Sequence, residues 1–419
     1  MNFSNYQIEF KKLLNRDYFS ADIHSLRKDA FSKLMTVGFP TQKWEEWRFT
    51  NISDIINSKY SISDANDSPD FDIDFSDHNL DGVDTVIIYN GHFQKEHSSI
   101  PKGVEVYSLS DFYKNDNHQQ ELSLDNSPFD LLNTAFMDSG LCLIVPENKC
   151  ITKPIKILFV SNGTRSIMIN PRIHIEVQKG ADVSIIEEYI GNSTSFFQNE
   201  TIFIDLKENA NCEHIRIQSN SNESNNIFNI HSKLDKDSSY NFFQHTDGGK
   251  LSRSSIYVDL NNQNAECNIN CLSLSKYKQH LDNSIIINHN SPNTYSKQFV
   301  KSILFDRSTG VFNGRTVVKK DAQKIEAHQT NNNLLLSKLA KMNSIPQLEI
   351  YADDVKCTHG STSGQLDEEA LFYFRSRGIP EKQAFMLLVT GFISEVMENI
   401  QLNPVKNYLN QKIDMWISK

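Results

Sequence analysis

Five short runs in the middle of the chain decide the fold class: Ile173-His174-Ile175-Glu176-Val177, Thr201-Ile202-Phe203-Ile204-Asp205-Leu206, His214-Ile215-Arg216-Ile217, Ile256-Tyr257-Val258-Asp259-Leu260 and Ser284-Ile285-Ile286-Ile287-Asn288. Apolar residues largely alternate with polar ones, which predicts half-buried β-strands. Such runs recur roughly every 13 to 16 residues between about 141 and 352, a spacing that fits a sandwich, a barrel or a solenoid. A solenoid is favoured, because the region lacks two-residue hairpin signals and is rich in Asn, which tolerates left-handed turns between stacked strands.

Helical signals precede this β-region. Ser20 can cap a helix whose apolar residues recur at helical spacing until Gly38. Trp44 and Trp47 are three residues apart, so we expect them to share one helix face and anchor the segment in the core. The stretch 61–84 is rich in Asp, Asn and Ser and is predicted to be a solvated linker.

Helical signals also follow the β-region. Asp367, Pro380 and Pro404 each stand at the start of a segment with helical periodicity. The expected organisation therefore has four parts: a helical region at 1–60, an acidic linker with a small α/β region at 61–140, a β-core at 141–362, and a helical domain at 363–419.

The charge balance of the chain bears on its partners and its compartment. The 419 residues include 42 Lys and Arg against 52 Asp and Glu, so the net charge of -10 disfavours nucleic acid and anionic membranes as partners. No apolar run approaches the ~18 residues that span a bilayer, and the first residues lack the apolar core of a signal peptide. Because the six cysteines are scattered, we expect reduced thiols and a cytoplasmic location.

The sharpest chemical feature is the sequence Cys357-Thr358-His359-Gly360. Residues two apart in a strand point to the same face, so the thiol and the imidazole would lie side by side. Cys and His suit zinc and iron, but a tetrahedral centre needs about four donors. The missing donors would come from elsewhere, for example from another subunit. The competing interpretation is a buried thiol beside a hydrogen-bonded histidine with no metal role.

Two further donor pairs lie within the β-region. Cys212 and His214 repeat the same spacing, and Cys267 and Cys271 are four apart, hence also on one strand face. Together they could form a self-contained zinc site. The alternative is that these cysteines act as small apolar side chains in the core.

Two enzyme motifs are nearly matched but incomplete. Gly248-Gly249-Lys250 is followed by Leu251 and lacks the first Gly of a phosphate-binding P-loop. Gly360-Ser361-Thr362-Ser363-Gly364 has Thr362 where a hydrolase has its nucleophilic serine. We therefore expect neither ATP hydrolysis nor serine hydrolase chemistry from this chain, and a partner would supply any ATPase.

Several motifs resemble one known family. They are GVFNGR at 310–315, DAQK at 321–324, NNNLLLS at 331–337, PQLEI at 346–350, ADDVKCTHG at 352–360 and LFYFRSRGI at 371–379. In these the chain resembles the SufB/SufD family of iron–sulfur cluster assembly proteins, most densely between about 310 and 395. The stretch from Trp44 to Thr50 is similar to the SufD branch, which makes that branch the nearer one.

The resemblance implies a mainly β protein with a right-handed parallel β-helix core, flanked by N-terminal and C-terminal helical domains. It implies a scaffold subunit rather than an enzyme, working with SufB and the ATPase SufC. His359 matches the functional histidine of the family's C-x-H-G segment, with Cys357 as its companion near the SufB interface, where a nascent iron–sulfur cluster would be shared. SufC would dock on the C-terminal helices, through Asp367, Leu371, Phe372, Phe374, Arg375, Arg377 and Phe385.

Two other functions compete with this one. One is the self-contained zinc protein that uses Cys212, His214, Cys267 and Cys271. The other is a β-helix enzyme acting on polysaccharides, with carboxylates along one solenoid face. The sequence leaves open whether the isolated chain forms a homodimer and whether a flavin joins the complex.

Overall fold

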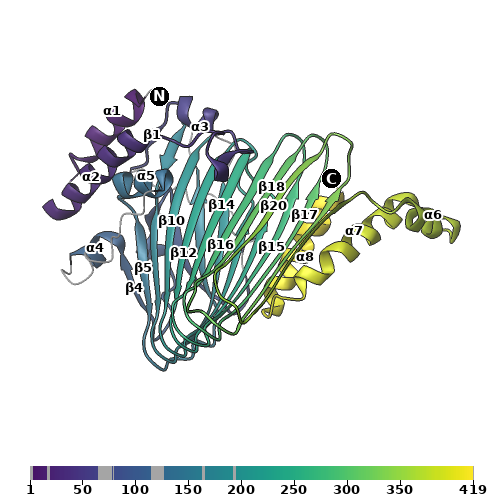
Figure 1. The fold of residues 1–419 in the computed structure, drawn as a ribbon. Coiled ribbons are helices and arrows are strands. Elements are labelled where there is room, and N and C mark those ends of the chain that lie inside the picture. The colour runs from purple at the N-terminus through teal and green to yellow at the C-terminus, as the bar shows by residue number, and fades with distance from the viewer. Residues whose placement is uncertain are drawn as a thin grey trace.

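The structure is a computed structural model that describes residues 3–16, 19–64, 78, 80–114, 127–162, 166–191 and 195–418. Its centre is a stack of long parallel strands, with helices at both ends of the chain (Figure 1). The expected mainly β fold, a parallel β-helix between helical terminal regions, is confirmed.

Consecutive strands of the stack alternate between two sheets, so that each coil of the solenoid contributes one strand to each sheet. Among the described residues, all strand pairs are parallel except β4–β5 and β2–β3. The first sheet contains β4 (Glu105–Ser108), β5 (Gly140–Val145), β8 (Arg172–Val177), β10 (Phe197–Leu206), β12 (Asn225–Leu234), β14 (Leu251–Leu260), β16 (His280–His289), β18 (Thr309–Val318) and β20 (Lys341–Ile350), with β1 (Ser61–Ile62) and β7 (Ile167–Ile169) beside them. The second contains β3 (His92–Phe93), β2 (Asp84–Tyr89), β6 (Ile155–Ser161), β9 (Asp182–Gly191), β11 (Asn211–Gln218), β13 (Ser239–Thr246), β15 (Glu266–Ser275), β17 (Tyr295–Leu304), β19 (Ile325–Leu335) and β21 (Val355–Gly364).

Ladders of apolar side chains fix the register of the stack. Ile173, Ile202, Ile230, Ile256 and Ile285 are partners on successive strands of the first sheet, and all five are fully buried. A slip of one residue would move such a ladder to the outer face. Each fully buried isoleucine contributes about 1.5–3 kcal/mol relative to an exposed one, which favours this single register.

The turns between strands use the left-handed conformation expected from the abundance of asparagine. Asn148, Asn209, Asn264 and Asn293 have φ angles of 55°, 58°, 60° and 58°. Asparagine tolerates this region better than most residues, because its short side chain can hydrogen-bond locally. The expectation that asparagine supports the turns of a solenoid is confirmed at these positions.

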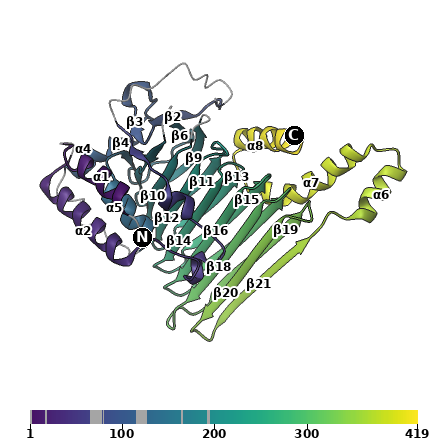
Figure 2. The same ribbon diagram turned by 90° about the horizontal axis from the view of Figure 1, so that it is seen from above.

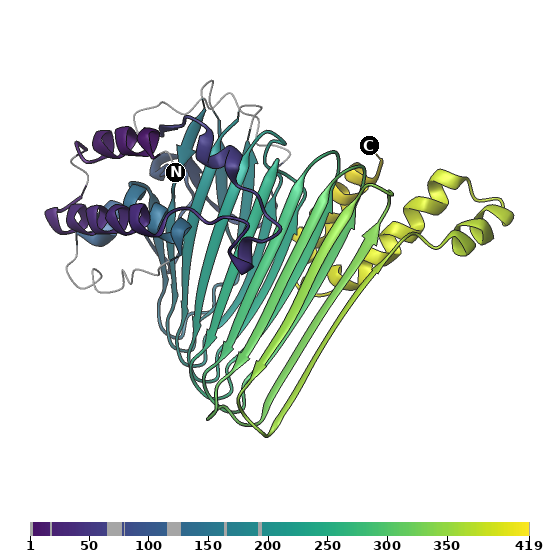
Figure 3. The same cartoon turned by 45° about the horizontal axis from the view of Figure 1, so that its top comes forward.

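The N-terminal helices lie on the first sheet near the start of the solenoid (Figure 3). As predicted, one of them begins after Ser20 and ends at Gly38, whose φ is 79°, but the Ser20 side chain makes no capping hydrogen bond. The helices are α1 (Ser4–Leu13), α2 (Ala21–Val37), α3 (Ser53–Asn57), α4 (Leu109–Tyr113) and α5 (Pro128–Phe136), with short 3₁₀ turns η1 (Glu45–Trp47) and η3 (Lys95–His97).

The tryptophan prediction was right for Trp47 and wrong for Trp44. Trp47 is buried, with its ring 5.2 Å from that of Phe129 and 4.1 Å from the guanidinium of Arg253. Trp44 is 38% exposed. Its backbone is extended and precedes the single turn η1, so the two tryptophans do not share a helix face. Most of the predicted acidic linker lies outside the described residues.

The three predicted C-terminal helices are α6 (Glu368–Ser376), α7 (Glu381–Met397) and α8 (Asn403–Ser418). Helices α7 and α8 pack on the outer face of the second sheet. Helix α6 extends away from the solenoid, beyond its C-terminal end (Figure 2). No helix in the described part of the chain is long and apolar enough to span a membrane.

Candidate functional site

The C-terminal end of the solenoid is open. Strands β20 and β21 form its last coil, and each is the outermost strand of its sheet. Along β21 nearly every residue is exposed, whereas alternate residues of the preceding strand β19 are buried. The last coil therefore presents unpaired backbone groups along two ten-residue edges, together with side chains that elsewhere would face the interior.

Cys357 and His359 lie on β21 at this open end. Their partners on β19 are Ala327 and Gln329, which are both buried inside the solenoid. Side chains of in-register neighbours share a face, so the thiol and the imidazole both lie on the interior side of the last strand. The predicted common face of the two residues is thus found in the structure.

The two side chains differ in their surroundings. Cys357 is partly buried against a small apolar cluster that includes Ile325, Ala327 and Ala352, and this burial raises the pKa of its thiol. His359 is exposed. Within the described ranges, no three His, Cys, Asp or Glu side chains are placed to hold a metal ion together. The open end thus offers two donors that another molecule can reach.

A set of hydrogen-bonded polar side chains adjoins this pair. The hydroxyl groups of Ser344 on β20 and Ser361 on β21 lie 2.8 Å apart, and Ser344 also donates to Asn331 at 2.8 Å. Asn331 and Asn333 are buried on β19 and exchange side-chain hydrogen bonds of 3.1 and 2.7 Å. Sequence reasoning missed this set as part of the site, although three consecutive asparagines within a strand were a signal.

The structure does not bring Cys212, His214, Cys267 and Cys271 together. Cys212 and Cys267 belong to one ladder, but Tyr240 stands between them, so their strands are about 10 Å apart. His214 instead has its Nδ1 2.9 Å from the Tyr240 hydroxyl. Burial raises the pKa of all three thiols, which disfavours the thiolate that a metal needs. The geometry gives the internal zinc site no support.

The predicted docking residues lie on α6 and the start of α7. No residue of α6 is buried, and Phe372 and Tyr373 are 72% and 56% exposed, although Tyr373 was not among the predicted residues. The Asp367 carboxylate accepts a hydrogen bond from the Ala370 N–H at 3.0 Å and so caps the helix. The other predicted residues are Leu371, Phe374 and Phe385, which are partly buried, and Arg375 and Arg377, which are exposed.

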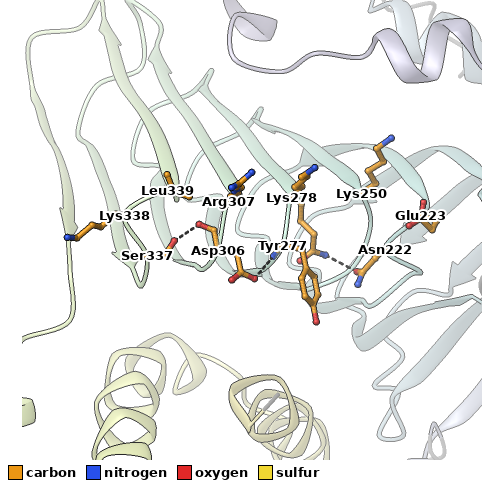
Figure 4. A pocket seen from close by; sticks show the side chains of 11 residues that line it. Asn222, Glu223, Lys250, Tyr277, Lys278, Asp306, Arg307, Ser337, Lys338 and Leu339 are labelled. Atoms are coloured by element: carbon orange, nitrogen blue, oxygen red, sulfur yellow. Dashed lines mark hydrogen bonds between the residues drawn. The ribbon is translucent and has the colours of Figure 1, made fainter.

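A cavity of about 1080 Å³ lies elsewhere, along the turns that precede β12, β14, β16, β18 and β20. Lys250, Lys278 and Arg307 stand on three successive coils there and point the same way (Figure 4). None of its eleven lining residues is a cysteine or a histidine. This cavity therefore has no thiol or imidazole donors, unlike the open end of the solenoid.

Comparison with known proteins agrees with this architecture. The family described as "SUF system FeS cluster assembly, SufBD core domain" matches residues 159–392, and "SufBD protein N-terminal region" matches residues 3–157. The iron–sulfur cluster assembly protein SufD of Escherichia coli is 29% identical over 91% of this chain and 90% of that protein. A SufBD family protein of Synechocystis is 30% identical over 92% and 89%, and the chloroplastic protein ABCI7 of Arabidopsis thaliana is 27% identical over 93% and 85%. The chain therefore belongs to the SufBD family of iron–sulfur cluster assembly proteins and is SufD-like.

Proposed function

We propose that this chain is a non-enzymatic scaffold subunit that completes a nascent iron–sulfur site together with a SufB-like partner. The observation that carries the proposal is the position of Cys357 and His359 on an outermost strand at the open end of the solenoid. Two donors in reach of another molecule suit a site whose remaining donors come from that molecule. The cluster is the cargo of such a site.

The two edge strands support docking of a second solenoid at this end. Both β20 and β21 are ten residues long, and in the described part of the chain neither has a neighbouring strand on its outer side. A partner with a matching edge would extend both sheets through main-chain hydrogen bonds. Docking of this kind would cover Cys357 and His359 and bring the partner's donors to them.

We further propose that a SufC-like ATPase docks on α6 and α7 and supplies ATP hydrolysis to a complex in the cytoplasm. The exposed rings of Phe372 and Tyr373 support this, because aromatic residues are favoured anchors at protein interfaces. Helix α6 also stands clear of the solenoid, so a partner can surround it (Figure 1).

The scaffold role is tested by co-expressing the chain with SufB and SufC homologues and measuring iron and acid-labile sulfide per complex. His359→Ala should lower both, because it removes one of the donors. His328→Ala is the matched control, since His328 lies on the neighbouring strand but is bonded on the outer face to Thr358 at 2.8 Å. Normal loading of the His359→Ala complex would make His359 a structural residue and refute the proposal.

Docking of the ATPase has its own test. Truncation after Gly364 removes all three C-terminal helices and should abolish co-purification with SufC, and Phe372→Asp should weaken it while the chain stays folded. Ile8→Asp is a matched control, because Ile8 is an exposed apolar residue on α1, 55% exposed. Equal recovery of SufC with Phe372→Asp and with the wild type would argue against α6 as the docking element.

A further inference from the structure

Gln329 lies directly beneath His359 in the solenoid. It is the register partner of His359 on β19 and is only 2% exposed. Neighbouring parallel strands are about 4.8 Å apart, so side chains at paired positions on one face lie within contact of each other. Along this ladder of paired residues, the Gln329 amide is therefore the interior polar group next to the exposed His359 imidazole.

Two hydrogen bonds inside the solenoid orient this amide. Gln329 Nε2 donates to Gln298 Oε1 at 3.1 Å, and Gln298 Nε2 donates to Thr316 Oγ1 at 3.2 Å. In this orientation Gln298 Oε1 can only accept, so the Gln329 amide directs its nitrogen toward it. The Gln329 Oε1 atom is then left as an acceptor, buried and without a hydrogen-bond partner among the described residues.

The opposite strand leaves space for this arrangement. A Cβ atom at Gly314 on β18 would lie 2.4 Å from Gln329 Nε2, which is closer than atoms can approach. A side chain at this position would force the Gln329 amide, or the ring of Phe312 at the same distance, to move. The Gln329 side chain is thus held by its hydrogen bond to Gln298, which is itself bonded to Thr316, and by the space at Gly314 in the facing sheet. A buried acceptor without a partner is unfavourable, so Gln329 Oε1 favours a nearby donor.

We propose that Gln329 is a positioning residue for His359, and that its Oε1 accepts a hydrogen bond from one ring N–H of the imidazole. A neutral imidazole has one N–H and one nitrogen lone pair. A bond to Gln329 selects one tautomer and directs the remaining lone pair away from the interior, toward an incoming metal. Histidines that bind metals commonly donate their other N–H to a carbonyl or carboxylate in this way.

The tautomer of His359 can be measured on the full-length chain alone, by long-range proton–nitrogen NMR correlation with ¹⁵N-labelled histidine at about pH 8, where an unperturbed imidazole is neutral. The wild type should show one dominant tautomer for His359. Gln329→Met should give a mixture of both, because a thioether is a poor acceptor, and Gln329→Glu should restore the single tautomer. His328 is the internal control and should not change.

Two results would overturn the proposal: a mixture of tautomers for His359 in the wild type, or the same single tautomer in Gln329→Met. If Gln329→Met does not fold, Gln298→Met serves instead, since it frees the Gln329 amide to rotate. The metal-binding consequence rests on the proposed function, but the NMR measurement uses neither partner nor iron. If the wild type shows a single tautomer but the His359→Ala complex loads iron and sulfide normally, the scaffold role is refuted and the proposed Gln329 contact is not.

Discussion

Replacing Glu200 by glutamine should make the stability of this protein less sensitive to rising pH. Glu200 is fully buried, and the Tyr189 hydroxyl lies 2.7 Å from its Oε1 and 3.0 Å from Oε2 of the equally buried Glu187. One hydroxyl hydrogen cannot serve both contacts, so a carboxyl group must bring a second proton. Burial raises the pKa of Glu187, but His214 and Arg216 together lower it more, which leaves the proton on Glu200.

The magnitude follows from the pKa of Glu200. Burial, and then the negative charge of Glu187, raise this pKa from 4.5 to about 8. Between these values the folded protein keeps a proton that the unfolded chain has lost, so the stabilisation is complete below pH 4.5 and is lost as the pH rises toward 8. A shift of this size corresponds to ~5 kcal/mol. Glutamine cannot ionise, so Glu200→Gln should remove this loss.

The assay is urea unfolding, followed by circular dichroism, from about pH 5 to about pH 8. The wild type should lose stability relative to Glu200→Gln as the pH rises, and the variant should be the more stable protein at the alkaline end. Glu147→Gln, which changes an exposed carboxylate, should follow the wild type. Parallel pH profiles for the wild type and Glu200→Gln would refute the buried proton.

Two further substitutions test the packing of the terminal helices on the solenoid. Arg253→Met removes the buried ionic partner of Asp282 and the cation above the Trp47 ring. It should lower the free energy of unfolding, measured with urea, by about 3–5 kcal/mol, because it leaves a buried carboxylate without its partner. A loss below about 1 kcal/mol would contradict the pairing. Lys301 donates to the Phe392 carbonyl at 2.7 Å and to Glu395 at 2.6 Å, so Lys301→Met should speed amide exchange along α7. Unchanged exchange in α7, measured by mass spectrometry, would show that the helix is held by its apolar face alone.

Local sequence patterns predicted the elements of this fold well. The alternating runs formed strands, asparagines hold several of the left-handed turn positions, and Asp367 caps the helix that follows it. The prediction for Trp44 was wrong because the spacing of two tryptophans does not show how long the helix is, and here it is a single 3₁₀ turn. These signals act within a few residues, where the chain itself determines the geometry.

The candidate site was only partly predictable, because a solenoid brings together residues about one coil apart in sequence. The two-residue spacing of Cys357 and His359 fixed their common face. Gln329 lies under His359 only through the register of β19 and β21, which no local pattern contains. The same limit explains the inner cysteines: Cys267 and Cys271 share a strand, but stacking places other side chains between them and Cys212.

The most direct test of the incomplete donor set is a Co²⁺ retention measurement, made after gel filtration on the isolated chain and on its complex with a SufB homologue. We expect the isolated chain to lose the metal and the complex to keep it, with retention lost in His359→Ala but not in Cys267→Ser. Tight retention by the isolated chain that disappears in Cys267→Ser would contradict the account, and so would a His359→Ala complex that holds the metal as firmly as the wild type.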